Sequence, residues 1–332
     1  MPSDWVPEVI ETKPKNRWNV IIRWAGTIIA IVILVYLFSQ IGAAETWATI
    51  QRISGWRIAA VLVLVFVSRF ATFGRWHSLL QVQDMHVPWQ DSLRLTFAGL
   101  FASNVLPTTV GGDVVRLAGA VRIGINPALA AASLIADRLV GMAGMFLALP
   151  FAIPSFVAYL NQNGTRSSVP LFSALPFVSN AWNKTQQAFK NVFSNFKYWA
   201  KNPLILLRAL GFTFIHMLAT FLIVQILIEG MGESMPFGQI AGLWSLTYFI
   251  TLLPISINGL GLQEVTITNL FSVVGGLQPS TSISLAILLR VVWMIGSLPG
   301  AFTLSGILSD EKKQSETVGQ AEVDSDQGVK TI

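Results

Sequence analysis

Charged side chains occur inside several otherwise apolar stretches of this sequence, and most of them are arginines. They are Arg69, Arg75, Arg94, Asp113, Arg116, Asp137, Arg138, Glu264 and Arg290. Ionisable groups are rare in apolar segments, where they usually face a cavity or a partner. Arginine binds phosphate through a forked set of donors, so we predict Arg138 and Arg290 as phosphate ligands. The chemistry that these residues favour is the recognition of an anion.

Two apolar segments, 91–122 and 237–274, are interrupted in the same way. The first break reads SNVLPTTVGGDVVR at 103–116, and the second reads ITLLPISINGLGLQE at 250–264. Each has Leu-Pro, a short polar linker, two glycines and then an acidic residue at the start of a helical stretch. A long helix with an arginine follows each break. The pattern indicates an internal duplication of a broken helix and an arginine-bearing span.

A broken helix can bind an anion without any charged side chain. It exposes backbone N–H groups and the positive end of a helix dipole, and glycine lets a phosphate approach that backbone closely. In transporters with internal repeats, such discontinuous helices meet near the midplane and form the substrate site. We therefore expect both breaks to line one substrate cavity. The alternative is that these prolines and glycines are only kinks, which membrane helices tolerate.

Some of the charged residues also have a structural interpretation. Asp113 and Arg116 are three residues apart on a predicted helix and could pair with each other. Glu264 has no such basic neighbour, which makes it the more interesting acid. Asp137 could be a helix-packing partner. These alternatives stay open from sequence alone.

Arg69 and Arg75 could extend their charged ends to the membrane interface, and this interpretation is favoured for Arg75 near the end of its span. His77 and His86 have no metal-ligand spacing, and His216 in an apolar helix is expected to be hydrogen-bonded. The sequence contains no cysteine, which excludes disulfides and thiolate metal sites. We predict no metal, no cofactor and no catalytic residue.

Composition sets the class of protein. The chain has 332 residues, of which 53% are hydrophobic and 12% charged, whereas soluble domains carry about 25% charged residues. The predicted fold class is all-α, a polytopic integral membrane protein with about 6–8 membrane segments. Apolar helices are expected at 19–38, 57–76, 128–150, 203–229 and 281–308. A signal peptide is the alternative for the first, although that run is longer than a signal sequence requires.

The expected organisation has three parts. Residues 1–16 form a disordered leader, 17–309 the transmembrane domain with repeat halves at 57–150 and 203–308, and 310–332 a disordered polar tail. An amphipathic helix is predicted at 180–201, with aromatic residues on one face and lysines on the other. This helix either lies in the membrane interface or covers neighbouring helices.

The number of spans depends on the broken segments. If both broken segments return to the side of the membrane from which they enter, the chain has five spans. If one of them crosses the membrane, it has six. Residues 151–202 contain five basic and no acidic residues, which favours a cytoplasmic placement and hence one net crossing.

The stretches NVLPTTVGGDVVRLAGAVRIGINPALAAASLIADRLVG and LLPISINGLGLQE, with the later LLRVVW, resemble the two signature regions of the lysylphosphatidylglycerol synthase transmembrane family, also called the flippase-like domain family. The resemblance covers about 19–308. It implies helix breaks at Pro107 and Pro254. It also implies the substrate-binding residues Gly111, Gly112, Asp113, Arg116, Asp137, Arg138, Ser256, Gly259, Gly261, Glu264 and Arg290. This chain departs from the family pattern at Asn258, usually glycine, and at Gln263, usually arginine, which removes one positive charge.

The chain resembles the stand-alone members, which lack the aminoacyl-transferase domain, and this implies a multi-pass protein of a prokaryotic cytoplasmic (inner) membrane. We predict a lipid translocator for an anionic phospholipid or a polyprenyl-phosphate-linked lipid, passive or coupled to an ion or proton. One alternative is a membrane scaffold or regulator of a lipid synthase or glycosyltransferase. A lipid-phosphate enzyme is a further alternative, for which the sequence supplies no histidine pair or carboxylate cluster. No nucleic-acid partner is expected.

Overall fold

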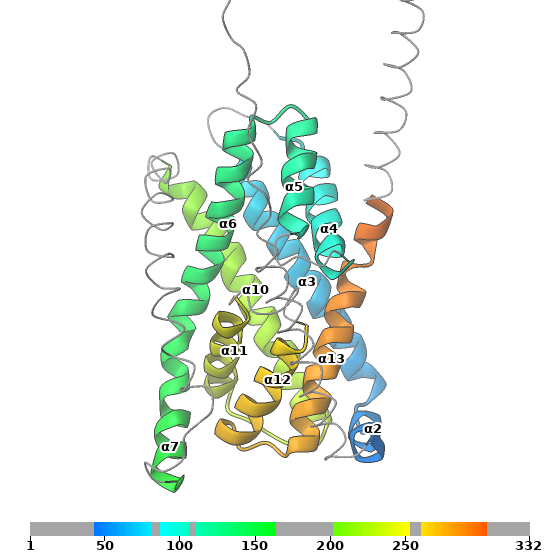
Figure 1. Cartoon of the computed structure of the whole chain (residues 1–332), viewed down its shortest axis with the longest axis vertical. Helices are drawn as coiled ribbons and strands as arrows, with labels where there is room; N and C mark the ends of the chain where they lie inside the picture. The colour runs from blue at the N-terminus through cyan, green and yellow to red at the C-terminus, as the bar shows by residue number, and fades with distance from the viewer. Residues whose placement is uncertain (1–42, 82–86, 106–110, 164–201, 253–259, 304–332) are drawn as a thin grey trace, which may run out of the picture.

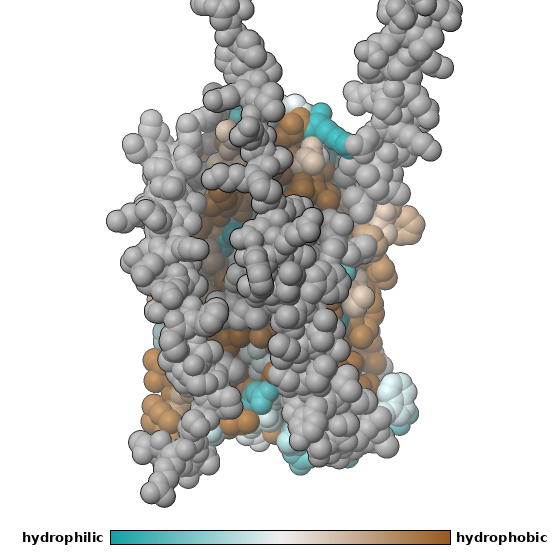
Figure 2. Space-filling view, in the orientation of Figure 1, coloured by the Kyte–Doolittle hydropathy of each residue, from teal (hydrophilic) through white to brown (hydrophobic). Residues whose placement is uncertain are grey.

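The computed structural model describes residues 43–81, 87–105, 111–163, 202–252 and 260–303. Within these ranges every regular element is a helix (Figure 1), which confirms the expected all-α class. Four helical stretches are long and apolar enough to cross a membrane: Gly55–Leu80, Pro127–Asn161, Pro203–Gly230 and Pro279–Thr303. Figure 2 shows that the described surface along the long sides of the molecule is mostly hydrophobic. The protein is therefore a polytopic α-helical membrane protein.

The first half consists of a span, a hairpin of two shorter helices and a second span. Its elements are α2 (Ala43–Gln51), α3 (Gly55–Leu80), α4 (Trp89–Val105), α5 (Gly111–Arg122), α6 (Pro127–Ala148), the 3₁₀ turn η1 (Leu149–Ala152) and α7 (Ile153–Asn163). Helices α4 and α5 are antiparallel, because Gly119 packs against Leu95 while Gly112 packs against Ser103. The glycines of α5 thus let it lie back along α4.

The second half repeats this order. Its elements are α10 (Pro203–Gly230), α11 (Phe237–Thr251), α12 (Leu262–Asn269), the π-helical turn η4 (Leu270–Val274) and α13 (Pro279–Ser297). The Gln239 side chain at the start of α11 donates a hydrogen bond to the Gly275 carbonyl oxygen at 3.3 Å. The beginning of α11 therefore lies beside the end of η4, and this pair is also an antiparallel hairpin.

Local sequence explains where several helices begin. Pro127, Pro203 and Pro279 occupy the first turns of α6, α10 and α13, where a missing N–H costs nothing because that group has no partner within the helix. The Asn126 side chain accepts hydrogen bonds from the first two free N–H groups of α6, at 2.9 and 3.4 Å. These signals give the spans fixed starting points.

The two halves run in opposite directions. Helices α3 and α10 are antiparallel, since Ser68 is hydrogen-bonded to His216 at 2.8 Å and Arg57 donates to the Glu229 carbonyl at 3.1 Å. The first of these contacts confirms that His216 is hydrogen-bonded. In Figure 1 the α4–α5 hairpin starts from the end where α3 finishes, and the α11–α12 hairpin starts from the opposite end. This is an inverted repeat.

Each half also packs its last helix against the hairpin of the other half. Gly242 of α11 lies so close to η1 that a Cβ atom there would overlap the backbone of Ala152. Gly300, in the helical continuation of α13, lies equally close to the Phe97 carbonyl group of α4. The two halves therefore pack against each other through two close backbone contacts that only glycine permits.

The expected spans at 57–76, 128–150, 203–229 and 281–308 correspond to α3, α6, α10 and α13. Within the described residues both broken segments fold back as antiparallel pairs, and the expected net crossing of one of them stays a prediction. The predicted helices at 19–38 and 180–201, the leader and the tail lie outside the described residues.

Candidate functional site

Five charged side chains from α3, α5 and α6 form one network. The carboxylate of Asp137 accepts hydrogen bonds from Arg75 Nε at 2.6 Å and from Arg116 Nη1 at 3.2 Å. Asp113 accepts a hydrogen bond from Arg138 Nε at 2.6 Å and lies 3.5 Å from Arg116. The Asp137 side chain is 4% exposed and that of Arg138 is 47% exposed. The network thus extends from the protein interior to an accessible arginine.

Arg116 joins the two carboxylates and has donors to spare. Its guanidinium carbon lies 4.1 Å from the centroid of the Trp76 ring, a cation–π contact. A Cβ at Gly99 would meet the Arg116 side chain at 2.7 Å, so this glycine makes room for it. The Nε and Nη2 atoms of Arg116 are buried and make no hydrogen bond within the described part of the chain. Two unused charged donors favour an anionic ligand at this position.

The second half holds the corresponding pair. Glu264, in the first turn of α12, forms an ion pair with Arg290 of α13. The two residues are 26 positions apart, against 25 for Asp113 and Arg138. The Glu264 side chain is 6% exposed, and its Oε2 atom is buried without a hydrogen-bond partner among the described residues. In both halves, therefore, the acid of the hairpin binds the arginine of the following span.

Helix α13 contacts both hairpins where each approaches its break. Its Arg290 holds α12, and seven residues later Ser297 accepts a hydrogen bond from Asn104 at the end of α4, at 2.7 Å. Seven residues correspond to about 10 Å along a helix. Between them, Arg69 donates to the Trp293 carbonyl at 3.2 Å and stacks on its ring at 4.8 Å. The two hairpin ends therefore contact α13 within about 10 Å of each other along its axis.

Positive charge exceeds negative charge in this region. The charged groups are the arginines at 69, 75, 116, 138 and 290 and the carboxylates at 113, 137 and 264. Five cations against three anions leave two positive charges uncompensated in the described part. The segments between the hairpin helices, 106–110 and 253–259, contain no charged residue. Because buried charges are costly unless paired, this arrangement suits a bound anion.

The structure revises several interpretations of the sequence. The expected interfacial position of Arg75 is wrong, because α3 continues to Leu80 and places Arg75 against the buried Asp137. Asp137 is an ion-pair partner and not merely a packing residue. Arg94 is exposed on α4. The remaining predicted residues, Pro107, Pro254, Ser256 and Gly259, lie outside the described residues.

The described glycines of the two breaks have backbone reasons for their identity. Gly111 and Gly112 are buried in the first turn of α5, and a Cβ at Gly112 would overlap the Ser103 hydroxyl and the Gly99 carbonyl. Gly261 precedes α12 with a φ of 75°, in the left-handed region that favours glycine. Close helix approach and a tight turn account for these positions before any ligand is considered.

Three aromatic residues near the charges were not predicted. Trp76 and Trp293 stack on guanidinium groups, and Tyr248 of α11 lies within electrostatic reach of Arg75 and Arg138. Tyr248 therefore brings part of the second half near the network of the first. Aromatic residues in apolar helices are common, so no signal in the sequence separates these from ordinary packing residues.

Comparison with known proteins agrees with the motifs. The chain matches the family model described as the lysylphosphatidylglycerol synthase TM region over residues 23–300. It is also 25% identical over 126 residues to a UPF0104 membrane protein of Archaeoglobus fulgidus. That alignment spans 38% of this chain and 38% of the relative's length. The match over most of the chain shows that this protein belongs to the lysylphosphatidylglycerol synthase TM-region family.

Proposed function

We propose that the protein moves a lipid with a phosphate-bearing head group between the two leaflets of a membrane. The lipid is an anionic phospholipid or a polyprenyl-phosphate-linked lipid. The observation that carries the proposal is the excess of two positive charges among the arginines and carboxylates of α3, α5, α6, α12 and α13. The family name, which refers to the synthesis of a lysylated phosphatidylglycerol, supports a lipid of this chemistry.

In this proposal the hairpins α4–α5 and α11–α12 are re-entrant, each entering the membrane and returning to its own side. The ends of the hairpins then meet near the midplane. Irregular backbone at that depth is stable only where protein or a water-filled cavity satisfies its polar groups. A polar cavity at the hairpin ends would satisfy the polar groups of the backbone and would also hold the lipid head group.

The phosphate would bind first at Arg138, the most accessible arginine of the first-half network. Its 47% exposure makes it reachable, and it can release Asp113 because that carboxylate also contacts Arg116. The unused donors of Arg116 would then complete the phosphate site. Asp113 and Glu264 are the candidates for proton coupling, since each would lose a cationic partner when phosphate binds an arginine.

A translocation assay tests the proposal directly. The protein is reconstituted into vesicles that contain phosphatidylglycerol with a fluorescent acyl chain, and the fraction quenched from outside is followed with time. Losing two charge-assisted contacts in Arg138→Gln/Arg290→Gln should slow the movement by at least about tenfold. Arg94→Gln, at an exposed arginine, is the matched control and should keep the parent rate. A correctly inserted double variant that moves lipid at the parent rate would refute the proposal.

The proposal assigns no chemical conversion to the protein, and it places the protein in the cytoplasmic membrane of a prokaryote. A lipid synthase or glycosyltransferase that makes or uses the lipid is the expected kind of partner. If parent vesicles show no movement of phosphatidylglycerol or of a polyprenyl phosphate, the scaffold interpretation becomes the better one.

A further inference from the structure

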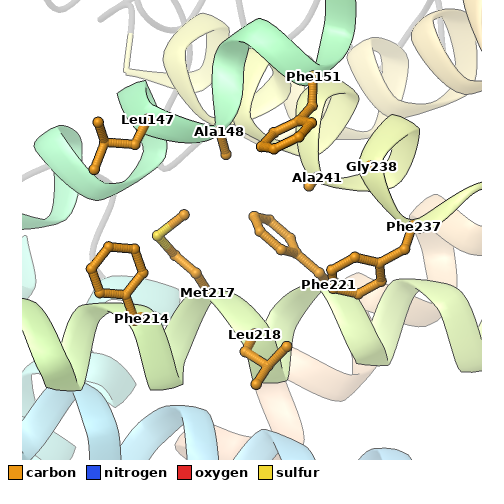
Figure 3. Close-up of a pocket in the computed structure, with 10 residues that line it drawn as sticks. All are labelled: Leu147, Ala148, Phe151, Phe214, Met217, Leu218, Phe221, Phe237, Gly238 and Ala241. Carbon is orange, nitrogen blue, oxygen red and sulfur yellow. The ribbon is translucent and has the colours of Figure 1, made fainter.

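A groove of about 420 Å³ lies between α6, η1, α10 and the first turns of α11 (Figure 3). Side chains from α6 and η1 face those of α10 from opposite walls, and four of the ten lining residues are phenylalanines. Its volume falls within the range of about 300–1,000 Å³ that is typical of ligand pockets. Leu147, Phe151 and Phe214 in its walls are at least half exposed, at 60%, 56% and 50%. The groove is therefore apolar and open to the side of the protein.

The groove shares α6 with the first-half network, and its lining also includes α11, the helix that carries Tyr248. On α6, Ala148 in the groove follows Arg138 by ten residues. On α11, Gly238 in the groove precedes Tyr248 by ten residues, and Tyr248 lies within electrostatic reach of Arg138. Ten residues correspond to about 15 Å along a helix. Helix α6 thus places the groove about 15 Å along its axis from Arg138.

This juxtaposition of a cationic site and an apolar groove matches the two parts of one lipid molecule. We infer that the groove binds one hydrocarbon chain of the lipid whose phosphate binds at Arg116 and Arg138. The inference rests on the proposed function and extends it from the head group to the chain. The chain would extend from the network toward the end of the molecule where α10 finishes and α11 begins (Figure 1).

A hydrocarbon chain of a lipid that is bound through its phosphate differs in one respect from the bilayer lipid that covers any apolar surface. A chain tethered to a bound phosphate has a high effective concentration at a groove within its reach. Occupancy of the groove therefore depends on the arginines about 15 Å away. Bulk lipid or another segment of this chain would occupy the groove regardless of those arginines.

Photocrosslinking in nanodiscs can measure this dependence. The probe is phosphatidylglycerol with a diazirine on one acyl chain, and the labelled positions are found by mass spectrometry. In the parent, label is expected on the groove residues of α6, η1 and α10. Arg116→Gln/Arg138→Gln should reduce this label at least about fivefold, the equivalent of about 1 kcal/mol. Diacylglycerol with the same chain, which has no phosphate, should label the groove weakly.

A second variant fills the groove itself. A Cβ at Gly238 would meet only Phe151, at 3.5 Å, so Gly238→Leu can extend into the groove without disturbing the fold. It should reduce groove labelling and translocation at least about fivefold, because the space for one or two methylene groups is lost. Gly55→Leu is the matched control, since Gly55 also lies in the first turn of a helix and has nothing within 4 Å.

The results separate this inference from the proposed function. Equal labelling by diacylglycerol, or labelling unchanged by Gly238→Leu, would overturn the inference. If the parent nevertheless moves phosphatidylglycerol, the proposed function stands without it. If the parent moves no lipid but groove labelling still requires Arg116 and Arg138, the proposed translocation is refuted. The inference that the groove binds a lipid chain is then retained.

Discussion

Replacing Asp137 by asparagine removes the carboxylate that Arg75 and Arg116 share, while it keeps the size of the side chain. The three side chains are 4%, 11% and 9% exposed, so water cannot replace the lost charge. Asp113 is then the nearest remaining anion, and it already pairs with Arg138. Breaking a buried ion pair from one side costs about 3–5 kcal/mol. We expect Asp137→Asn to lower the free energy of unfolding by about this amount.

Asp113→Asn is the matched comparison in the same network. The Asp113 side chain is 18% exposed and that of Arg138 is 47% exposed, so water can solvate the arginine that is left. Ion pairs of this kind contribute about 0–1 kcal/mol. Both variants are measured by unfolding in mixed detergent micelles, followed by circular dichroism. The expected order of stability is parent, then Asp113→Asn, then Asp137→Asn.

A double-mutant cycle with Arg75→Gln tests the cause of the effect. If the cost arises from an unpaired Arg75, removing this arginine as well should recover part of it. The coupling free energy between the two positions should then lie within about 0.5–3 kcal/mol. Strict additivity, or equal losses for Asp137→Asn and Asp113→Asn, would refute the assignment of Asp137 as the buried centre of the network.

Two further predictions concern packing. Gly242→Val should destabilise the protein at or above the upper end of the usual overpacking cost of about 1–3 kcal/mol, because its side chain would overlap the backbone of Ala152. Gly211→Val on α10, with nothing within 4 Å of its Cβ, should change stability by less than about 0.5 kcal/mol in the same micelle assay. Trp76→Leu should weaken stability by more than the same change at Trp89, which is 57% exposed, since it removes a buried ring, its hydrogen bond to Ser133 and a cation–π contact to Arg116 worth about 0.5–2 kcal/mol. Equal losses at Trp76 and Trp89 would mean that the buried contacts of Trp76 contribute nothing.

Most of the site residues that could be predicted from the sequence belong to the repeated motif. An acid at the start of the second hairpin helix and an arginine 25 or 26 residues later have the same arrangement in both halves, and both become ion pairs. The break itself was visible because proline and glycine have backbone requirements that do not depend on distant contacts. Local chemistry therefore predicted the broken helices and the residues near their ends.

The contacts of α3 could not be predicted in this way. Arg75 and Asp137 are 62 residues apart, and Arg69 and Trp293 are 224 apart, with no repeated spacing between them. Whether an arginine in an apolar helix reaches the interface or an internal carboxylate depends on which helix packs beside it. The groove was equally invisible, because phenylalanine, alanine and glycine line it and the same residues fill ordinary helix contacts.

The two halves share a backbone plan but differ in charge. In the first half, Arg116 stands three residues after the hairpin acid and Asp137 stands just before the arginine of the span. The corresponding residues of the second half are Ile267 and Leu289, both fully buried. The second half thus has apolar residues where the first half has an ion pair with two unused donors.

This difference has a consequence for the proposed lipid transport. Inverted halves of identical sequence would bind a phosphate equally well in two states related by their symmetry. A ligand shifts an equilibrium between states only through a difference in its affinity for them. Because the unused donors of Arg116 belong to the first half alone, the phosphate should bind more tightly in the state that exposes Arg138 than in the one that exposes Arg290. The protein would then load and release its lipid unequally at the two membrane faces, and no nucleotide is needed to create that asymmetry.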